Sequence, residues 1–292
     1  MEVQRLRECK VSALWIENVT RRFISSPANT MKNKAGEPAW DQPIVGYSNG
    51  ADSLYEFYRR DIGSFYVTPA EFMRHAYPKQ DFKLDQLTVI SWVLPQTTAT
   101  KTDHRKETEW PCERWARTRI FGEEVNDELR RHLVKALVDA GVEAVAPVLS
   151  ALWRRETSKK YGFASTWSER HAAYAAGLGT FGLSDGLITS EGKAHRAGSV
   201  IANLVLPPTK RPYKDHHAYC LFYAKRTCGA CIKRCPARAI TEKGHDKEKC
   251  SSYPDRTHAY VESHYGFKGY GCGLCQVGAP CESHIPEGIE IQ

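Results

Sequence analysis

The sequence predicts a mixed α/β domain followed by a smaller domain that is rich in cysteine. Two apolar, β-branched runs at residues 87–94 and 199–206 indicate buried strands, and an amphipathic run between them indicates a helix. Eight of the ten cysteines fall after residue 219. We therefore expect an α/β domain over residues 1–210, of which 1–40 form an extension, and a metal-binding domain over residues 211–292.

The first two helices are predicted from turn formers and a capping residue. Residues 1–40 indicate a helix and then a long connector, because the run 25–38 is rich in turn formers. Residues 53–60 follow Asp52, a good helix cap. The residues expected on the buried face of that helix are Leu54, Phe57 and Tyr58.

A capping box and a buried strand come next. Thr68 and Glu71 have the spacing of a capping box, with Pro69 at the first helical position, so a helix should begin at Thr68. The run 87–94 is continuously apolar and stops at Pro95, as expected of a strand buried on both faces. We expect it to be the central strand.

The remainder of the first domain alternates helices and strands. Apolar residues at three-to-four spacing over 123–140 end at Gly141, a typical helix C-terminus. Strands are expected at 142–148 and 199–206. This alternation predicts a sheet covered by helices.

A glycine-rich segment follows an expected helix at 167–176. Its glycines are Gly177, Gly179, Gly182 and Gly186. A dinucleotide-binding fold needs a strand before such glycines, so we reject that function. Glycine does allow the backbone to approach a ligand closely. The alternative is a tight helix-to-loop turn that holds no ligand.

Composition places the chain among globular proteins without a membrane span. Hydrophobic residues make up 41% and charged residues 26%, and no apolar run approaches the roughly 18 residues of a membrane helix. The charged N-terminus lacks an export signal, so we expect a cytoplasmic protein. In a reducing compartment, clustered cysteines indicate metal rather than disulfides.

The cysteine spacing predicts two [4Fe-4S] clusters. The run Cys228-x2-Cys231-x3-Cys235-Pro236 matches the end of a bacterial ferredoxin run, in which the cysteine before proline binds the other cluster. One cluster is therefore assigned to Cys220, Cys228, Cys231 and Cys281, and the other to Cys235, Cys250, Cys272 and Cys275. Zinc is the alternative, because paired C-x2-C units also build zinc ribbons.

Positive charge is concentrated near the first of these cysteines. Residues 193–243 contain eleven Lys or Arg and two acidic residues, within a chain of net charge +7. An RNA-binding surface can have this composition. The alternative is that the cations offset the negative charge of thiolate-bound clusters, with the rest on a solvated face.

Several motifs outside the cysteines resemble one family. These motifs are Glu169-Arg170-x6-Gly177-Leu178-Gly179-x2-Gly182, Arg196-x-Gly198-Ser199, Lys249-Cys250-Ser251-Ser252-Tyr253 and Gly271-Cys272-Gly273-Leu274-Cys275-Gln276. Together they resemble the epoxyqueuosine reductases, which are related to the corrinoid-dependent reductive dehalogenases. The resemblance covers about residues 85–285.

This resemblance implies a fold, cofactors and partners. It implies a nitroreductase-like cobalamin domain followed by a two-cluster ferredoxin-like domain. Electrons would pass from a reduced ferredoxin or flavodoxin-type donor through the clusters to a cobalamin, and then to a small molecule or a modified nucleoside. The implied cofactor-binding residues are Glu169, Gly177, Gly179, Gly182, Arg196 and Ser199.

The chain departs from that family at the catalytic acid. The family's aspartate lies six residues before the glutamate of the motif, where this chain has Phe163, and the lysine after G-x-x-G is here Leu183. The dehalogenase relatives use a tyrosine as proton donor, which makes Tyr161 the candidate catalytic residue. Other donors near the expected site are Ser165, His171 and Tyr174.

Two functions from different classes remain open at this stage. The first is an iron–sulfur reductase with its own substrate. The second is a ferredoxin-like electron-transfer partner that lacks substrate chemistry, which the absence of an acid at Phe163 would favour. A zinc-bearing RNA-binding protein is the third reading, and it draws only on the basic stretch.

Overall fold

A four-stranded antiparallel sheet forms the centre of the computed structural model, which describes residues 11–290. The strand order is β1-β2-β8-β3. The strands are β1 (Ile44–Asn49), β2 (Leu87–Pro95), β8 (His195–Asn203) and β3 (Ala144–Val145). All nine residues of β2 are buried, and β2 pairs with both β1 and β8. The prediction of a central strand buried on both faces is therefore confirmed.

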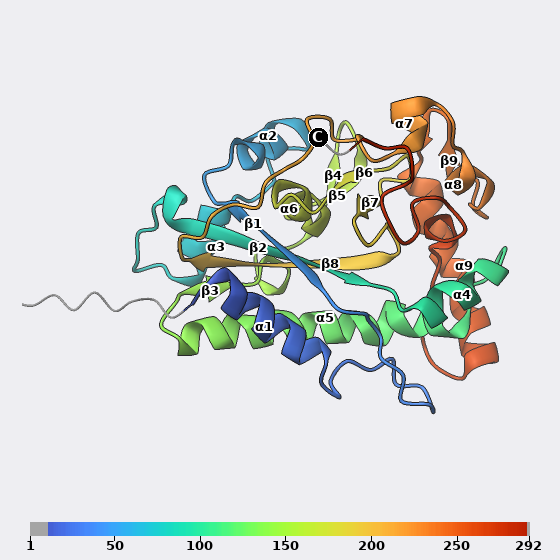
Figure 1. The fold of residues 1–292 in the computed structure, drawn as a ribbon, viewed down its shortest axis with the longest axis horizontal. Helices are drawn as coiled ribbons and strands as arrows, with labels where there is room; N and C mark the ends of the chain where they lie inside the picture. The colour runs from blue at the N-terminus through green and yellow to red at the C-terminus, as the bar shows by residue number, and fades with distance from the viewer. Residues whose placement is uncertain (1–10, 291–292) are drawn as a thin grey trace, which may run out of the picture.

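Helices cover both faces of this sheet (Figure 1). Helices α1 (Ala13–Ile24) and α5 (Glu113–Asp139) pack on the face that carries Ile90 and Trp92 of β2. The opposite face carries Leu87 and Val89 and is covered by three further helices. These are α2 (Ser53–Asp61), α3 (Pro69–Ala76) and α6 (Glu169–Ala175). The predicted helix-covered sheet is thus a three-layer arrangement.

Two short hairpins, one helix and two 3-10 turns complete the described part of the first domain, residues 11–210. The hairpins are β4 (Arg155–Ser158) with β5 (Gly162–Ser165) and β6 (Gly179–Phe181) with β7 (Leu187–Thr189). The helix is α4 (Thr98–Lys106), and the 3-10 turns are η1 (Leu84–Gln86) and η2 (Pro147–Leu149).

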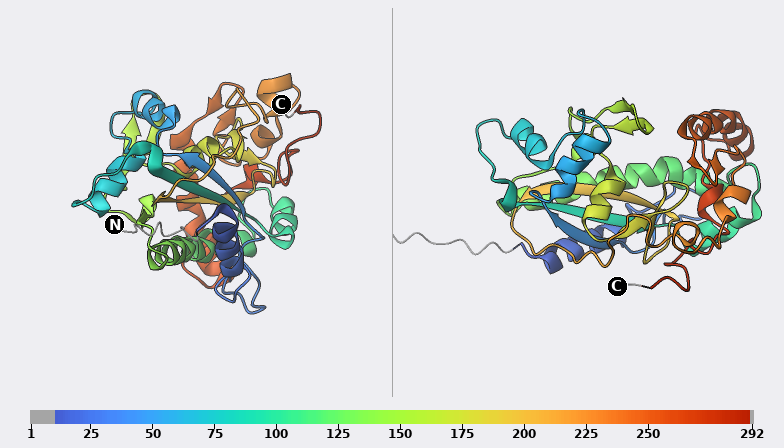
Figure 2. Two further views of the ribbon diagram at one scale, coloured as in Figure 1. Left: turned by 60° about the vertical axis from the view of Figure 1, so that its left-hand side comes forward. Right: turned by 90° about the horizontal axis from the view of Figure 1, so that it is seen from above.

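Most of residues 211–290 gather at one end of the sheet (Figures 1 and 2). This C-terminal segment consists of short elements and one long helix. They are α7 (Leu221–Lys225), α8 (Ala230–Lys233), β9 (Ile240–Thr241), β10 (Gly244–His245), α9 (Lys247–Tyr265) and η3 (Leu274–Gln276). Arg105 of α4 forms an ion pair with Glu282 at 2.6 Å, and this pair joins the C-terminal segment to α4. The domain boundary at residue 210 stays a prediction.

The capping predictions hold and some element bounds were wrong. Thr68 and Glu71 form the expected capping box, and Asp52 caps α2. The buried face of α2 is instead Tyr55 and Tyr58, and Phe57 is 46% exposed. Tyr55 replaces Phe57 on that face because its ring stacks on the buried Trp167.

Three other bounds also differ from the prediction. Helix α5 begins at Glu113 rather than at residue 123, and β8 begins at His195 rather than at residue 199. The strand expected at 142–148 is reduced to two residues, because Pro147 begins a 3-10 turn. Among residues 11–290, no helix is long and apolar enough to cross a membrane.

Candidate redox site

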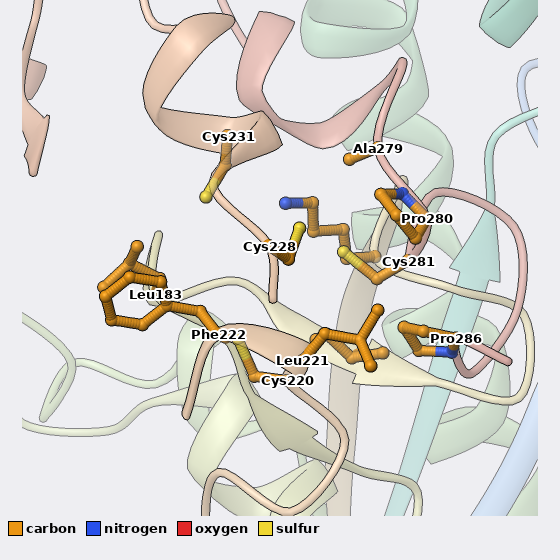
Figure 3. Close-up of a pocket in the computed structure, with 13 residues that line it drawn as sticks. Leu183, Cys220, Leu221, Phe222, Cys228, Cys231, Ala279, Pro280, Cys281 and Pro286 are labelled. Carbon is orange, nitrogen blue, oxygen red and sulfur yellow. The ribbon is translucent and has the colours of Figure 1, made fainter. Parts of the chain in front are cut away.

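Four cysteines line one cavity between the C-terminal segment and the sheet domain (Figure 3). Cys220 precedes α7, Cys231 lies in α8, and Cys228 lies in the loop between these helices. Cys281 comes from the last loop of the chain. Together Cys220, Cys228, Cys231 and Cys281 are called the Cys281 group below. Leu183 presents its aliphatic side chain to the same cavity.

The other four cysteines, Cys235, Cys250, Cys272 and Cys275, form a second group, called the Cys250 group. Burial, and then the charges of Cys272 and Cys235, raise the pKa of Cys250 to about 11. Burial raises the pKa of Cys275 to about 12, and the charges of Cys272, Cys250 and Cys235 add to this rise while Lys193 opposes it. The pKa of Cys250 and that of Cys275 thus both respond to the charges of Cys235 and Cys272.

The cavity of the Cys281 group brings together the four cysteines that the spacing assigned to one cluster. Among residues 11–290, no three His, Cys, Asp or Glu side chains converge closely enough to hold a single metal ion. The remaining described cysteine, Cys112, is buried before α5, outside both groups. The assignment of the eight thiols as ligands stays a prediction.

Backbone N–H groups point at two of these sulfurs. Ala239 N–H donates to the Cys235 thiol at 3.3 Å, and hydrogen bonds from Gly273 and Leu274 lower the pKa of Cys272 against the larger, opposite effect of burial. Gly273 has φ +96°, and a Cβ there would lie 2.4 Å from the Trp115 ring. Only glycine lets this loop bring its amides to the sulfur.

A buried lysine stands among the thiols. Lys193 is 3% exposed and lines the cavity of the Cys281 group. Burial lowers its pKa, but Cys281, Cys275 and Cys231 oppose burial so strongly that the net direction is upward. In the sequence, Lys193 stands out only as one cation of the basic stretch at residues 193–243.

Three of the residues implied by the resemblance lie in one ion-pair network on the sheet. Glu169 accepts hydrogen bonds from Ser199 and from Arg130, the latter at 3.1 Å. Burial raises the pKa of Glu169, and Arg130 is the strongest opposing influence. Arg196 joins through Glu123, which lies 3.2 Å from Arg196 and 3.3 Å from Arg130. In this network the side chains of Glu169 and Ser199 have hydrogen-bond partners within the protein.

The implied glycines contact the chain's own backbone. A Cβ at Gly177 would lie 2.7 Å from the carbonyl oxygen of Lys210, and a Cβ at Gly179 would lie 2.2 Å from that of Ile188. Gly177 also has φ +75°. These close contacts explain why both positions are glycine, because a side chain there would clash with the backbone of the tight turn. This explanation needs no ligand. Gly182 instead lines the cavity of the Cys281 group.

Tyr161 lies at the turn between β4 and β5, beside an acid that the sequence analysis missed. Its hydroxyl donates to Asp61 Oδ2 at 2.7 Å, and Lys160 Nζ donates to Asp61 Oδ1 at 2.6 Å. Burial is the main cause that raises the pKa of Tyr161. Lys247, at the start of α9, donates to the carbonyl oxygen of Phe163 at 3.3 Å and places the hairpin near Cys250.

The other proposed proton donors are turned to structural partners. Ser165 donates to the Trp167 carbonyl at 2.5 Å. His171 bonds Ser168 at 2.8 Å, and burial lowers its pKa to about 3. Tyr174 packs on the Tyr213 ring at 5.1 Å. Tyr161 is therefore the candidate whose hydroxyl faces a carboxylate.

No model of a known protein family and no curated protein matches this sequence. Three solved structures to which the chain is similar are two epoxyqueuosine reductases and one dehalogenase. A selenomethionine-labelled epoxyqueuosine reductase has 18% identity and a TM-score of 0.46, with 95% of this chain and 70% of that chain covered. An epoxyqueuosine reductase from Bacillus subtilis has 17% identity and a TM-score of 0.45, with 94% and 68% covered.

The third structure is the catabolic reductive dehalogenase NpRdhA, with 13% identity and a TM-score of 0.49. That match covers 94% of this chain and 37% of the dehalogenase, so this chain corresponds to only part of that enzyme. These are the two families that the sequence motifs resemble. Function is argued below from the residues of this chain.

Proposed function

We propose that this chain is an iron–sulfur oxidoreductase that holds one [4Fe-4S] cluster on the Cys281 group and another on the Cys250 group. The observation that carries the proposal is the cavity that the four thiols of the Cys281 group line. Four thiolates are the ligand set of a [4Fe-4S] cluster. When bound, the clusters supply one-electron transfer between a donor and a substrate.

The surroundings of the thiols fit such clusters. Sulfur ligands of a cluster are negatively charged and are stabilised by nearby cations and by N–H donors. Lys193 supplies a cation, and Ala239 supplies an N–H donor to Cys235. Neutral thiols or disulfides carry no charge that a buried ammonium would offset.

The residues carried over for cobalamin do not form a cradle for it. Gly177 and Gly179 approach backbone carbonyls of this chain, and Glu169 is bonded to Ser199 and Arg130. We therefore assign no step to cobalamin. A substrate that accepts electrons directly from the cluster on the Cys250 group is the simpler arrangement.

The proton for the reduction is assigned to Tyr161. A phenol of ordinary pKa, about 10, is protonated at neutral pH, so Tyr161 can donate a proton to an anion that develops on the substrate. Burial and the carboxylate of Asp61 raise the pKa of Tyr161, and Lys160, which donates to Asp61 at 2.6 Å, opposes that rise and so partly offsets the charge beside the phenolate. The substrate proposed for this site is a small molecule or a modified nucleoside, with a ferredoxin or flavodoxin-type donor.

An iron and sulfide count tests the core of the proposal. Protein purified without oxygen should contain about eight irons and eight sulfides per chain, because each cluster contains four of each. Dithionite should bleach its brown absorbance reversibly. A colourless protein that contains only zinc would refute the proposal.

A substitution tests the proton donor. Tyr161→Phe should slow the reoxidation of the reduced protein by an active substrate about a hundredfold, measured by stopped-flow absorbance against a panel of modified nucleosides and small electrophiles. The iron content should not change. Tyr260→Phe, on α9, is the control and should react at the normal rate. An unchanged rate in Tyr161→Phe would remove Tyr161 from the mechanism.

A further inference from the structure

We propose that Lys193 sets the reduction potential of the cluster on the Cys281 group, by holding an ammonium group against the thiolate of Cys281. The inference rests on the proposed function, since it needs a cluster at that group. It adds a role for a residue that no cysteine motif contains. Three observations support this role: the place that the backbone gives Lys193, the burial of its side chain and the cavity that it lines.

The backbone fixes Lys193 beside Cys281. Lys193 N–H donates to the carbonyl oxygen of Cys281 at 2.8 Å, and Ala194 N–H donates to that of Glu282 at 3.2 Å. Gly192, which precedes Lys193, has φ +75°, and a Cβ there would lie 2.2 Å from the Glu282 carbonyl oxygen. The two segments thus run side by side, which leaves the lysine little freedom to leave the cavity.

The side chain then lies among thiols. Lys193 lines the cavity together with Cys220, Cys228, Cys231 and Cys281. The side chains that raise the pKa of Lys193 are the thiols of Cys281, Cys275 and Cys231. Cys275, of the Cys250 group, packs against the apolar cluster that contains Cys231 and Cys281.

A buried ammonium in this place has a defined electrostatic effect. Burying a lysine without an anionic partner is costly, and the lysine loses its proton instead. A cluster with four thiolates carries negative charge that increases by one on reduction. A fixed positive charge beside the sulfur ligands therefore favours the reduced cluster and raises its potential.

Lys193 supplies the one positive charge among the residues that line this cavity. Position 183, where the resembling family has lysine, is Leu183, and its side chain lines the same cavity. Lys193 enters that cavity from the turn after β7. An aliphatic residue at one position and a cation at the other leave the cavity with one positive charge.

Three variants of the cluster-loaded protein test the inference. Lys193→Met removes charge and donor, Lys193→Gln keeps a donor without charge, and Lys193→Arg keeps both. Lys214→Met removes an exposed charge from the same C-terminal segment and serves as the control. Iron content is counted first, and each reduction potential is then measured by titration with detection of the reduced clusters by electron paramagnetic resonance.

We expect Lys193→Met to weaken the electron affinity of one cluster about tenfold, a shift of about 59 mV for one electron. That cluster should be the one whose signal disappears in Cys281→Ser. Lys193→Gln should fall between Met and wild type, and Lys193→Arg and Lys214→Met should stay near wild type.

The outcomes separate the two proposals. Full iron with unchanged potentials in Lys193→Met, or an equal shift in Lys193→Arg and Lys193→Met, would overturn the role of the charge and leave the proposed function intact. A wild-type protein without iron would overturn both. If Lys193→Met loses its clusters, the comparison of Lys193→Gln with Lys193→Arg decides, because these two differ in charge.

Discussion

At the scale of single residues, the division between the two cysteine groups runs through α8. Cys231 lies inside that helix, whereas Cys235 follows its C-cap, Arg234. The amide of Ala239 holds the Cys235 sulfur from the other side. The two thiols therefore face different neighbours although only three residues separate them.

The first prediction follows from this division. Cys235→Ser should remove the cluster that also uses Cys250, and Cys281→Ser should remove the other, so each variant should retain about four irons with a different remaining resonance spectrum. Cys112→Ser is the control, because Cys112 lies outside both groups, and it should retain about eight irons. Loss of the same resonance in both cluster variants would break the assignment.

A second prediction at this scale concerns the contribution of Arg130 to stability. It is 1% exposed and pairs with Asp127 at 2.6 Å and Glu169 at 3.1 Å. Arg130→Met leaves the buried Glu169 carboxylate without its cation, so we expect the free energy of unfolding to fall by about 3–5 kcal/mol. Urea denaturation measures the loss.

Arg131→Met is the matched control for that measurement. Arg131 is the next residue on the same helix and is exposed, so its loss should change stability by less than about 0.5 kcal/mol. Equal stability of the two variants would show that the Glu169 network contributes nothing to folding.

The cysteines could be assigned to two groups from the sequence because the signals for this assignment lie within a few residues of each other. A C-x2-C pair and a proline after Cys235 are visible within a few positions. Lys193 and Asp61 were missed for the opposite reason. Asp61 meets Tyr161 across 100 positions, and Lys193 reaches Cys281 only through the pairing of two distant backbone segments. No spacing rule relates such residues.

At the scale of elements, the capping box of α3 allows a direct test. Glu71 accepts hydrogen bonds from both the amide and the hydroxyl of Thr68, each at 2.8 Å. Thr68→Ala removes the hydroxyl and should lower the free energy of unfolding by about 1 kcal/mol. Thr102→Ala, at an exposed position inside α4, should have a much smaller effect. Thermal and urea unfolding of the two variants give the comparison.

The same scale shows why other element bounds were missed. The first part of α5 has few large apolar residues at helical spacing, because its buried positions include Ala116, Thr118 and Gly122. A Cβ at Gly122 would lie 2.7 Å from the Trp40 ring, so the contact there needs glycine. Periodicity of apolar residues detects only the second part of such a helix. The start of β8 was missed for the same reason, because its first residues, His195 and Arg196, are not apolar.

At the scale of the whole molecule, one buried carboxylate joins the C-terminal segment to the rest. Glu282 is 6% exposed, accepts from Arg105 at 2.6 Å and accepts from the amide of Gly278 at 2.7 Å. Arg234 adds hydrogen bonds to the carbonyl oxygens of His104 and Arg105, at 3.2 and 3.1 Å. Because Glu282 follows Cys281, this joint also holds the last cysteine in place.

The last prediction concerns the pH dependence of that joint. Burial opposes ionisation of Glu282, but Arg105 and Gly278 outweigh it and hold the pKa of Glu282 below its usual range. A lowered pKa in the folded protein gives stability that is present above the unfolded pKa of about 4.3 and lost as pH falls through the folded pKa. Glu282→Gln should therefore melt below wild type at pH 7, and the gap should narrow toward about pH 3. Glu287→Gln, at an exposed site, should match wild type throughout, and a gap independent of pH would show that the carboxylate charge does not hold the joint.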